Sequence, residues 1–506
     1  MIWTHLYRNS LVICFLIVPL LTACSNPHSN LTNSKVNGTQ SHAEEKLNIG
    51  IMLPAYYKKS PDEDSPVIKQ LEEITNTELN FRFVPSTTYS SALSIAISLD
   101  SLPEITVIPG KTVAFIDAVR AGKFWELGPY LKDYPNLSQA NSLILNNASI
   151  DGKTYGIYRA RTLGRMGVSV RRDWMDRLGL DNPQTIDDFY DLLKAFTEQD
   201  PDGNGKDDTY GMVVTSYSGP WDIMQVWFGA PNGWGMDENG RLIPAHLTPE
   251  YMEALRFFRK IYSEGLVNRN FAVMDPNQWV EPIVRGEAGV IVDVADMAQR
   301  VEGKIQRTKA QEQVMDVFGA PEGPYGRRDY STAGYGGMIA ISKSSVKTEE
   351  ELKQVLAFLD RINDEDAQIL LGNGIAGRHY EDMGSYVIPS EDQDVMVELQ
   401  NLNQLLMFIP EDRTRPVESS GLREKAEQLQ VDNEKIIVSD LAEPLVSDEY
   451  AEKGEKLDKI INDARTMFIM GQIDEAGLEQ ATVEWRRSGG DEYIEDINEL
   501  YSKSLP

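Results

Sequence analysis

The segment from Asp200 to Asp208 has the spacing of a loop that wraps oxygen atoms around a hard cation. Side-chain oxygens stand at loop positions 1, 3, 5 and 9, supplied by Asp200, Asp202, Asn204 and Asp208. The Lys206 carbonyl supplies another oxygen, whereas position 12, usually glutamate, is glycine. We therefore predict a structural Ca²⁺ whose shell is completed by a remote acid or water. The alternative is an Asx/Gly-rich turn without metal.

A basic cluster lies just before this loop. A run of 14 residues without any acid contains Arg159, Arg161, Arg165, Arg171 and Arg172. Arginine forks bind carboxylates through two parallel hydrogen bonds. We hypothesise that Arg159, Arg161 and Arg165 hold a ligand that carries uronic acid or another anionic group. The alternative is that these arginines pair with the acidic surface. A second, shorter basic pair stands at residues 327 and 328.

Aromatic residues in segments rich in glycine and proline are candidates for ligand contact. A flat aromatic ring stacks on the apolar C–H face of a sugar, while polar neighbours bond the hydroxyl edge. The candidates are Trp221, Trp227, Trp234, Trp279 and Tyr335. The alternative for each tryptophan is that it fills a core.

Charge and composition exclude several classes of function. The net charge is −29, from 49 basic and 78 acidic residues, so the surface repels phosphate backbones and nucleic acid is not an expected partner. Among the 5 histidines, only His246 and His379 fall in the expected folded body, where we predict surface or pocket-rim positions. No acidic residue stands in a recognisable acid/base motif. We therefore expect binding and not catalysis.

The N-terminus predicts export and a lipid anchor. The apolar run Leu11–Leu21 is shorter than a membrane span and ends in Leu-Thr-Ala-Cys24, which resembles a lipobox. Residues 1–23 are then a signal peptide, and Cys24 carries the lipid. Residues 24–46 are polar and form a flexible tether. We expect a monomer on the extracellular face of the membrane, attached through lipid only.

The elements that position these residues alternate between strand and helix. Buried or alternating strands are expected at 47–53, 79–84 and 105–108, with helices after Ser65-Pro66 and over 89–99. This order predicts a parallel α/β core. Later helices begin at Thr185, Thr248 and Thr348, with short strands between them. Mostly helical sequence follows residue 422.

A series of motifs resembles family 1 extracellular solute-binding proteins, and in particular their large lipoprotein branch from Gram-positive bacteria, which serves oligosaccharide ABC importers. The motifs, in order, are DGKTYGI (151–157), VRRDWMDRLGL (170–180), TIDDF (185–189), DPDGNGK (200–206), FGAPNGW (228–234) and GEAGV (286–290). The resemblance covers essentially the whole chain after the signal peptide.

The resemblance implies a two-lobe α/β fold of the type II, Venus-flytrap kind, here with extra C-terminal helices. Chain crossings are then expected near 158–161, 292–293 and 336–338. They assign 47–160 plus 293–337 to an N-terminal lobe and 161–292 plus 338–506 to a C-terminal lobe. The implied function is capture of an oligosaccharide for an ABC permease. Two alternatives stay open: a peptide-binding lipoprotein, and a secreted polysaccharide-degrading enzyme.

Overall fold

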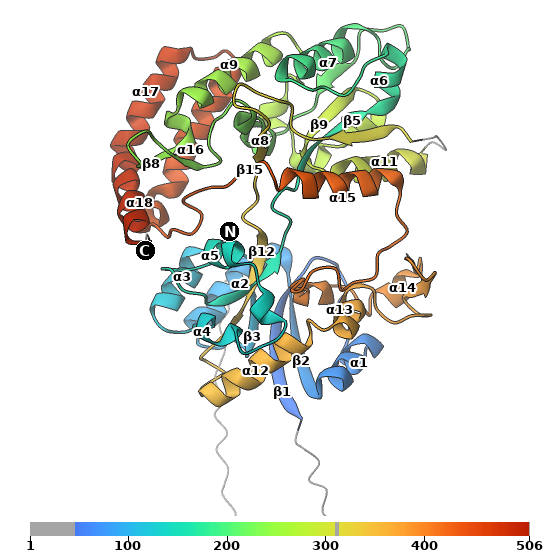
Figure 1. Ribbon diagram of the computed structural model, residues 1–506, viewed down its shortest axis with the longest axis vertical. Helices are drawn as coiled ribbons and strands as arrows, with labels where there is room; N and C mark the ends of the chain where they lie inside the picture. Colours follow the sequence, from blue (N-terminus) through green and yellow to red (C-terminus); the bar gives the residue numbers. More distant parts are fainter. Residues whose placement is uncertain (1–45, 309–312, 505–506) are drawn as a thin grey trace, which may run out of the picture. The chain divides into compact units, whose positions relative to one another are not determined.

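The computed structural model describes residues 46–308 and 313–504, and residues 46–506 group as one compact unit (Figure 1). The predicted signal peptide, Cys24 and the tether up to residue 45 lie outside the described residues. Within the described ranges, no helix is both long and apolar enough to cross a bilayer.

A five-stranded sheet has the order β2-β1-β3-β12-β4. Strands β2, β1 and β3 are parallel, while β12 runs antiparallel to both β3 and β4. The strands are β1 (Leu47–Ala55), β2 (Thr77–Pro85), β3 (Ile105–Ile108), β4 (Gly156–Ala160) and β12 (Tyr335–Ile341). The helices between β1 and β4 along the chain are α1 (Pro66–Thr75), α2 (Ser86–Ser98), α3 (Val113–Arg120), α4 (Gly128–Leu131) and α5 (Ser142–Asn147).

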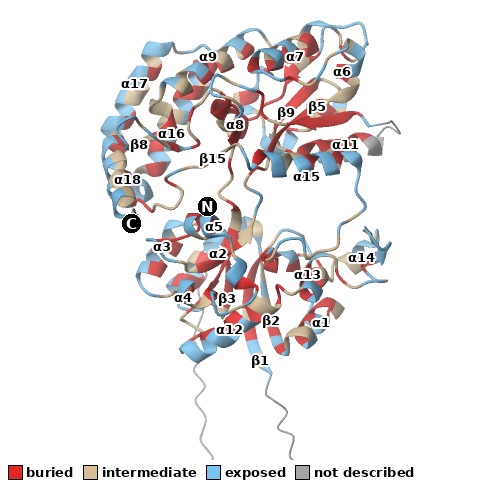
Figure 2. Ribbon diagram, viewed as in Figure 1, coloured by how far each residue is buried: buried red, intermediate tan, exposed pale blue. Residues whose placement is uncertain are grey.

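The core around this sheet defines the first lobe. Apart from the edge strand β2, the strands of this sheet are mostly buried (Figure 2), as expected for strands covered by helices. The same core includes residues between 352 and 409. These belong largely to α12 (Glu349–Arg361), α13 (Glu365–Gly372) and the 3₁₀ turn Leu402–Leu405, beside which stand β13 (Tyr380–Asp382), β14 (Val387–Pro389) and α14 (Gln393–Met396).

A four-stranded sheet with the order β10-β5-β9-β6 forms the centre of the second lobe. Strand β9 is parallel to β6 and antiparallel to β5. The strands are β5 (Met166–Arg171), β6 (Tyr210–Met212), β9 (Ala288–Val294) and β10 (Met315–Phe318). The helices are α6 (Arg172–Leu178), α7 (Ile186–Glu198), α8 (Gly219–Trp227), α9 (Pro249–Ser263), α10 (Glu281–Arg285) and α11 (Met297–Thr308).

The predicted exchange of residues between lobes is wrong for two segments. Strands β9 and β10 pair in the second sheet, so residues 293–334 do not return to the first lobe near 292–293. Strand β12 pairs with β3 and β4, which places residues 338–409 in the first core and not in the C-terminal lobe. Buried strands look alike in both lobes, so periodicity could not tell which sheet each strand joins.

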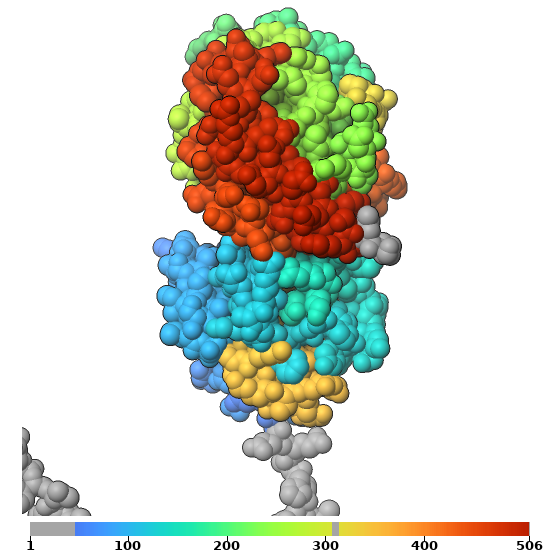
Figure 3. Space-filling view, turned by 90° about the vertical axis from the view of Figure 1, so that its left-hand side faces the viewer, coloured from blue at the N-terminus to red at the C-terminus, as the bar shows by residue number. Residues whose placement is uncertain are grey.

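The last part of the chain is helical, as expected, and contributes to the second lobe. Its helices are α15 (Gly421–Asn433), α16 (Asp448–Ile469), α17 (Glu475–Trp485) and α18 (Asp491–Ser504). Phe468, Ile469 and Leu478 join the core that contains α7 and α9. Figure 3 shows this segment covering one face of the second lobe. The short strands β7 (Trp234–Met236) and β8 (Leu242–Pro244) pair with each other, and β11 (Asp329–Tyr330) pairs with β15 (Ile437–Val438).

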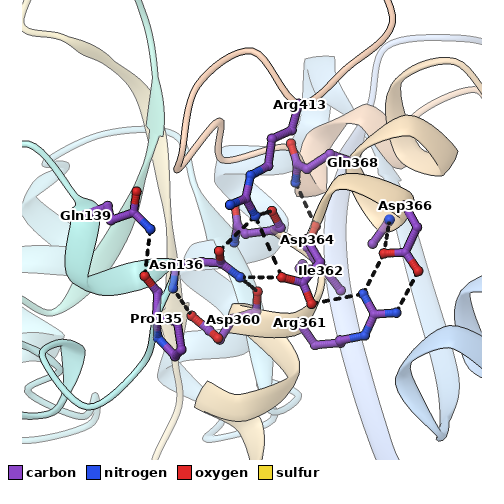
Figure 4. A network of polar contacts seen from close by, with 12 residues as sticks. Pro135, Asn136, Gln139, Asp360, Arg361, Ile362, Asp364, Asp366, Gln368 and Arg413 are labelled. Atoms are coloured by element: carbon purple, nitrogen blue, oxygen red, sulfur yellow. Dashed lines mark hydrogen bonds and ion pairs between the residues drawn. The ribbon is translucent and has the colours of Figure 1, made fainter.

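A partly buried polar network holds the segment that leaves the first lobe (Figure 4). The Asn136 backbone N–H donates to Asp360 Oδ1 at 2.8 Å, and its side-chain nitrogen donates to Asp364 Oδ1 at 2.8 Å. Arg413 Nη1 donates to Asn136 Oδ1 at 2.8 Å. These satisfied bonds offset the desolvation of the groups and fix Arg413 before the chain continues to α15.

Candidate functional site

The carboxyl ends of several first-lobe strands meet at one edge of the sheet. Strands β1 and β3 are parallel and end at Ala55 and Ile108. Met338 pairs with Ile108, and Tyr335 pairs with Ala160, so β12 begins and β4 ends at the same edge. Ligands of open α/β sheets bind outside this kind of edge. We call it the strand-end site.

Two exposed tyrosines follow β1 at this edge, and no sequence motif marked them. Tyr56 is 64% exposed and Tyr57 is 55% exposed. The buried Asn401 fixes their backbone, because its Oδ1 accepts the N–H groups of Tyr56 (2.8 Å) and Tyr57 (3.2 Å). Its Nδ2 donates to the carbonyl of Lys59 at 3.2 Å. The phenol rings are thus presented to solvent on a fixed backbone.

Arg159 and Arg161 lie near the first of these tyrosines, Tyr56. Arg159 Nη1 donates to the Gly336 carbonyl at 2.9 Å, while its Nε is buried without a partner among the described residues. Burial lowers the pKa of both guanidinium groups, and the Tyr56 phenol is close enough to influence each of them. Among the described residues, no carboxylate lies within ion-pair distance of Arg159 or Arg161. Their charge is therefore available to an anionic ligand.

The other three arginines of the cluster form ion pairs with acidic residues, as the alternative interpretation predicts. Arg165, which precedes β5 in the second lobe, lies 3.4 Å from Asp296. Arg171 forms an ion pair with Asp173 at 2.5 Å, and Arg172 with Asp176 at 2.5 Å. The basic cluster therefore divides into a paired part and, as far as the described chain shows, an unpaired part made of Arg159 and Arg161.

The predicted tryptophan platforms are packed inside the second lobe instead. Their exposed fractions are at most 6%, for Trp234 and Trp279. Trp221 and Trp227 lie on α8, where Trp227 packs edge-on against Phe189 at 5.4 Å. Trp279 Nε1 donates to the Val213 carbonyl at 3.0 Å. Packing against the cores of the second lobe buries these rings, so Trp221, Trp227 and Trp279 are core residues and leave the candidate ligand set.

Tyr335 and Lys111 meet the segment that precedes α16. The Tyr335 hydroxyl donates to Glu443 Oε1 at 2.9 Å, and burial raises its pKa. Lys111 Nζ donates to the carbonyls of Asn147 and Glu443 and lies 3.8 Å from the Glu443 carboxylate. Burial lowers the pKa of Lys111, although Glu443 opposes this shift. Tyr335 therefore already has a polar partner.

A cavity of about 680 Å³ adjoins this contact, and its lining includes Trp234, Asp440 and Tyr450. Burial raises the pKa of Asp440 to about 7, although the N–H of Ala442 donates to its Oδ1 at 2.9 Å. His246 also lines the cavity, and burial lowers its pKa to about 3. His379 is fully buried in the first lobe, so the surface or pocket-rim position predicted for it is wrong.

The Asp200–Asp208 loop brings its oxygen side chains together. Asp200 Oδ2 accepts the Gly205 N–H at 2.9 Å, which is the main reason that its pKa is lowered. Asn204 Nδ2 donates to Asp202 Oδ2 at 2.6 Å and to Asp208 Oδ1 at 3.1 Å. The Lys206 N–H donates to Asn204 Oδ1 at 2.8 Å. Across the described ranges, no group of three or more His, Cys, Asp or Glu side chains is arranged to hold a metal.

Gly211, at position 12 of this loop, has no room for a glutamate side chain. A Cβ on Gly211 would lie 2.7 Å from the Leu193 carbonyl oxygen, because β6 passes closely over α7. Glu287 lies near instead: its carbonyl accepts the Tyr210 N–H at 3.0 Å, and its carboxylate interacts electrostatically with Asp208. The oxygen shell predicted from the sequence needs a remote acid, and Glu287 is a nearby one, although its carboxylate now accepts two hydrogen bonds from Arg285 at 2.7 and 2.8 Å.

Comparison with known proteins places this geometry in a family. Residues 59–369 match the family of bacterial extracellular solute-binding proteins. Lipoprotein LipO of Bacillus subtilis (strain 168) is 46% identical over 494 residues, which cover 96% of this chain and 96% of LipO. The polygalacturonan/rhamnogalacturonan-binding protein YtcQ of the same strain is 36% identical, over 91% of this chain and 92% of YtcQ.

A solved structure agrees at the level of the fold. The EF-hand mutant of the substrate-binding protein FusA of Streptococcus pneumoniae, in complex with fructo-nystose, has a TM-score of 0.64 at 18% identity, over 90% of this chain and 99% of FusA. The two sheets with helices around them are consistent with this two-lobe α/β architecture. The family match and the identity to LipO along nearly the full length show that the chain belongs to the bacterial extracellular solute-binding proteins.

Proposed function

We propose that the protein captures an acidic oligosaccharide at the strand-end site and delivers it to an ABC importer. The observation that carries this proposal is the pair Arg159 and Arg161, which lack carboxylate partners among the described residues and lie beside the exposed Tyr56. Arginine forks match the geometry of a sugar carboxylate, and a phenol ring matches the C–H face. The name of the relative YtcQ, a polygalacturonan/rhamnogalacturonan-binding protein, supports the same ligand class.

Capture by two lobes requires contacts from both sheets. The corresponding edge of the second sheet carries Tyr217, which follows β6 and is 47% exposed, and Asp293, which lies near the end of β9. Burial raises the pKa of Asp293, so this carboxyl accepts a proton more readily than an exposed one. A ligand that touches both edges at once shifts the lobes toward closure by its differential affinity.

The test replaces one unpaired arginine. Arg161→Gln should weaken binding of trigalacturonate about tenfold or more, because a charge-assisted fork is lost. It should leave binding of the neutral galactotriose nearly unchanged. The measurement is titration calorimetry with both sugars and with an acidic peptide. Arg256→Gln is the matched control, because Arg256 is exposed and paired with Glu253 and Glu475. Equal affinity for the acidic and neutral sugars, tighter peptide binding, or cleavage of the sugar would contradict the proposal.

The proposed cellular location of the protein depends on Cys24. We infer that this cysteine is lipidated after removal of residues 1–23 and that a monomer stays attached to the extracellular face of the membrane. The family is extracellular, and the relative LipO is named a lipoprotein. Cys24→Ala should release the protein into the medium and abolish its labelling by radioactive palmitate. Retention of the label in this variant would place the lipid elsewhere.

We infer further that the Asp200–Asp208 loop binds Ca²⁺. The residue types suit a hard cation, because the Asp202 and Asp208 carboxylates both accept hydrogen bonds from the Asn204 amide and Glu287 is close to Asp208. Bound calcium would neutralise these carboxylates and tie the end of α7 to β6. Its role is structural. The FusA structure is that of an EF-hand mutant, so this relative has an EF-hand, which is in keeping with a calcium loop here.

Removal of calcium gives a thermal test. Calcium should raise the unfolding midpoint by several degrees, and a chelator should reverse this, because a ligand stabilises the folded state by mass action. Asp202→Asn should remove the response. The control is Asp237→Asn in the β7–β8 turn, where Asp237 accepts the N–H groups of Asn239 and Arg241 in a similar turn. A midpoint that does not respond to calcium in the unaltered protein would refute the site.

A further inference from the structure

A cavity of about 620 Å³ opens in the second lobe, away from the strand-end residues. It is bounded by the loop after α8, by the β7–β8 hairpin, by the segment before β11 and by residues 435–441. Its volume falls within the range of ordinary small-molecule sites. It contains neither Tyr56 nor Arg159 nor Arg161, so it is a separate candidate.

The cavity is cationic in a strongly acidic chain. Arg327, Arg328 and Lys435 line it, and Glu250 is the acid of the lining. Arg327 Nη2 donates to the neutral amide oxygen of Gln184 at 2.6 Å. Within the described part of the chain, Arg328 Nε is buried and has no hydrogen-bond partner. In that described part, no carboxylate lies within ion-pair distance of Arg327 or Arg328.

Lys435 adds a third positive charge, which a neighbouring carboxylate partly compensates. It pairs with Asp432 at 2.8 Å, but both side chains are more than half exposed, so the pair is well solvated. Glu250 is engaged by the Tyr325 hydroxyl, which donates to its Oε1 at 3.1 Å. The balance of charge around the cavity therefore favours an anion.

The exposed Tyr325 ring gives the cavity an aromatic wall. It is 59% exposed, and a Cβ on Gly229 would lie 2.3 Å from its Cδ2, so glycine is needed for the ring to lie there. Gly323 and Gly326 exchange backbone hydrogen bonds at 3.2 and 3.1 Å, which closes the turn that presents the ring. A ring held in this way loses little conformational entropy when a ligand stacks on it.

We propose that this cavity is a second binding site for a saccharide unit that carries a carboxylate. The guanidinium groups of Arg327 and Arg328 bind the carboxylate, and the Tyr325 ring stacks on the C–H face of the sugar. The ligand class rests on the proposed function, but the residues are different. A chain with both sites holds an acidic glycan at two places, and loss of either site leaves the other.

The experiment measures binding of digalacturonate by the full-length protein that already carries Arg161→Gln. Residual binding at the second site should persist in this variant. Adding Arg328→Gln, or Tyr325→Ala as a second probe, should weaken it about tenfold or more. The neutral galactobiose should not bind. Higher salt should weaken the residual binding, because the contact is ionic. A crystal structure of the complex should place a sugar ring against Tyr325.

The outcomes separate this site from the strand-end site. Absence of residual binding in the Arg161→Gln protein, or residual binding that Arg328→Gln does not change, would overturn the second site. Equal binding by the unaltered protein and by Arg161→Gln would instead count against the proposed function, and the Arg328→Gln comparison would still decide the second site. Arg256→Gln, added in the same way, should change nothing. Thermal unfolding of each variant confirms that it is folded.

Discussion

Ion pairing decides which arginine is free to act. Sequence spacing placed Arg159, Arg161 and Arg165 in one cluster, but Arg165 has Asp296 at 3.4 Å, and the other two lie where β4 ends. The acidic partner comes from a distant part of the chain, so spacing could not reveal it. The exposed Tyr56 and Tyr57 carried no motif at all, and only the end of β1 and the bond to Asn401 mark them.

Asp329 makes a testable contribution to the pH dependence of stability. Burial raises its pKa to about 7, and its Oδ2 is buried without a partner among the described residues. The folded state therefore holds a proton that the unfolded state releases near pH 4, so the free energy of unfolding falls as pH rises from about 4 through 7. Asp329→Asn imitates the protonated form. It should stabilise the protein by roughly 1 to 3 kcal/mol at pH 8 and change little at pH 4.

Urea unfolding at both pH values measures this effect. Asp296→Asn is the control, because Asp296 pairs with Arg165 and Arg300 and should not gain stability as pH rises. If Asp329→Asn gives the same change at pH 4 and pH 8, the buried carboxyl does not titrate in this range.

Local start signals predicted helices well, because they depend on neighbouring residues. Thr185 and Thr348 each form a complete capping box, with Asp188 and Glu351 respectively. Ser65 precedes α1 as expected but does not cap it, since its hydroxyl donates to the Glu398 carbonyl at 3.1 Å. The inward turn of Trp221 and Trp227 depends on the packing of α8 against the second core, which sequence alone does not encode locally.

The backbone of the loop after β1 is held by one buried side-chain amide, that of Asn401. Asn401→Gly should therefore release this loop from the rest of the first lobe. Glycine accepts the left-handed backbone of this position (φ 68°) and removes only the side chain. We expect a loss of about 1 to 3 kcal/mol in stability, since the N–H groups of Tyr56 and Tyr57 lose their acceptor. Sugar affinity at the strand-end site should fall as the loop becomes mobile.

Calorimetry and hydrogen exchange of residues 56–60 measure both effects. The matched control is Asn136→Ala, which removes a buried amide of the same lobe that donates to the Asp360 carbonyl and accepts from Arg413 instead. This control should lose stability without losing affinity. If the two variants lose affinity equally, Asn401 has no special positioning role.

Strand pairing between distant segments is the level at which sequence prediction failed. The α/β class and the C-terminal helices were predicted, yet β10 and most of β12 were placed in the wrong lobes. Residues 335–409 complete the first core only after the second lobe has been traversed. A contact between β12 and β3 joins residues more than two hundred positions apart, and no local pattern specifies such a partner.

This discontinuity leads to a prediction for the whole protein. A ligand held by the first lobe alone would protect only residues 56–57 and 159–161 from hydrogen exchange. A ligand held by both lobes should also protect Tyr217 and the end of β9 near Asp293, because those residues form the matching edge of the second sheet. We expect protection of both edges on adding trigalacturonate, since a ligand that bridges the lobes lowers the free energy of each. At a trigalacturonate concentration near the Kd of the unaltered protein, Arg161→Gln should reduce the protection at both edges together. Protection limited to the first lobe would mean that the sugar is captured without engaging the second sheet.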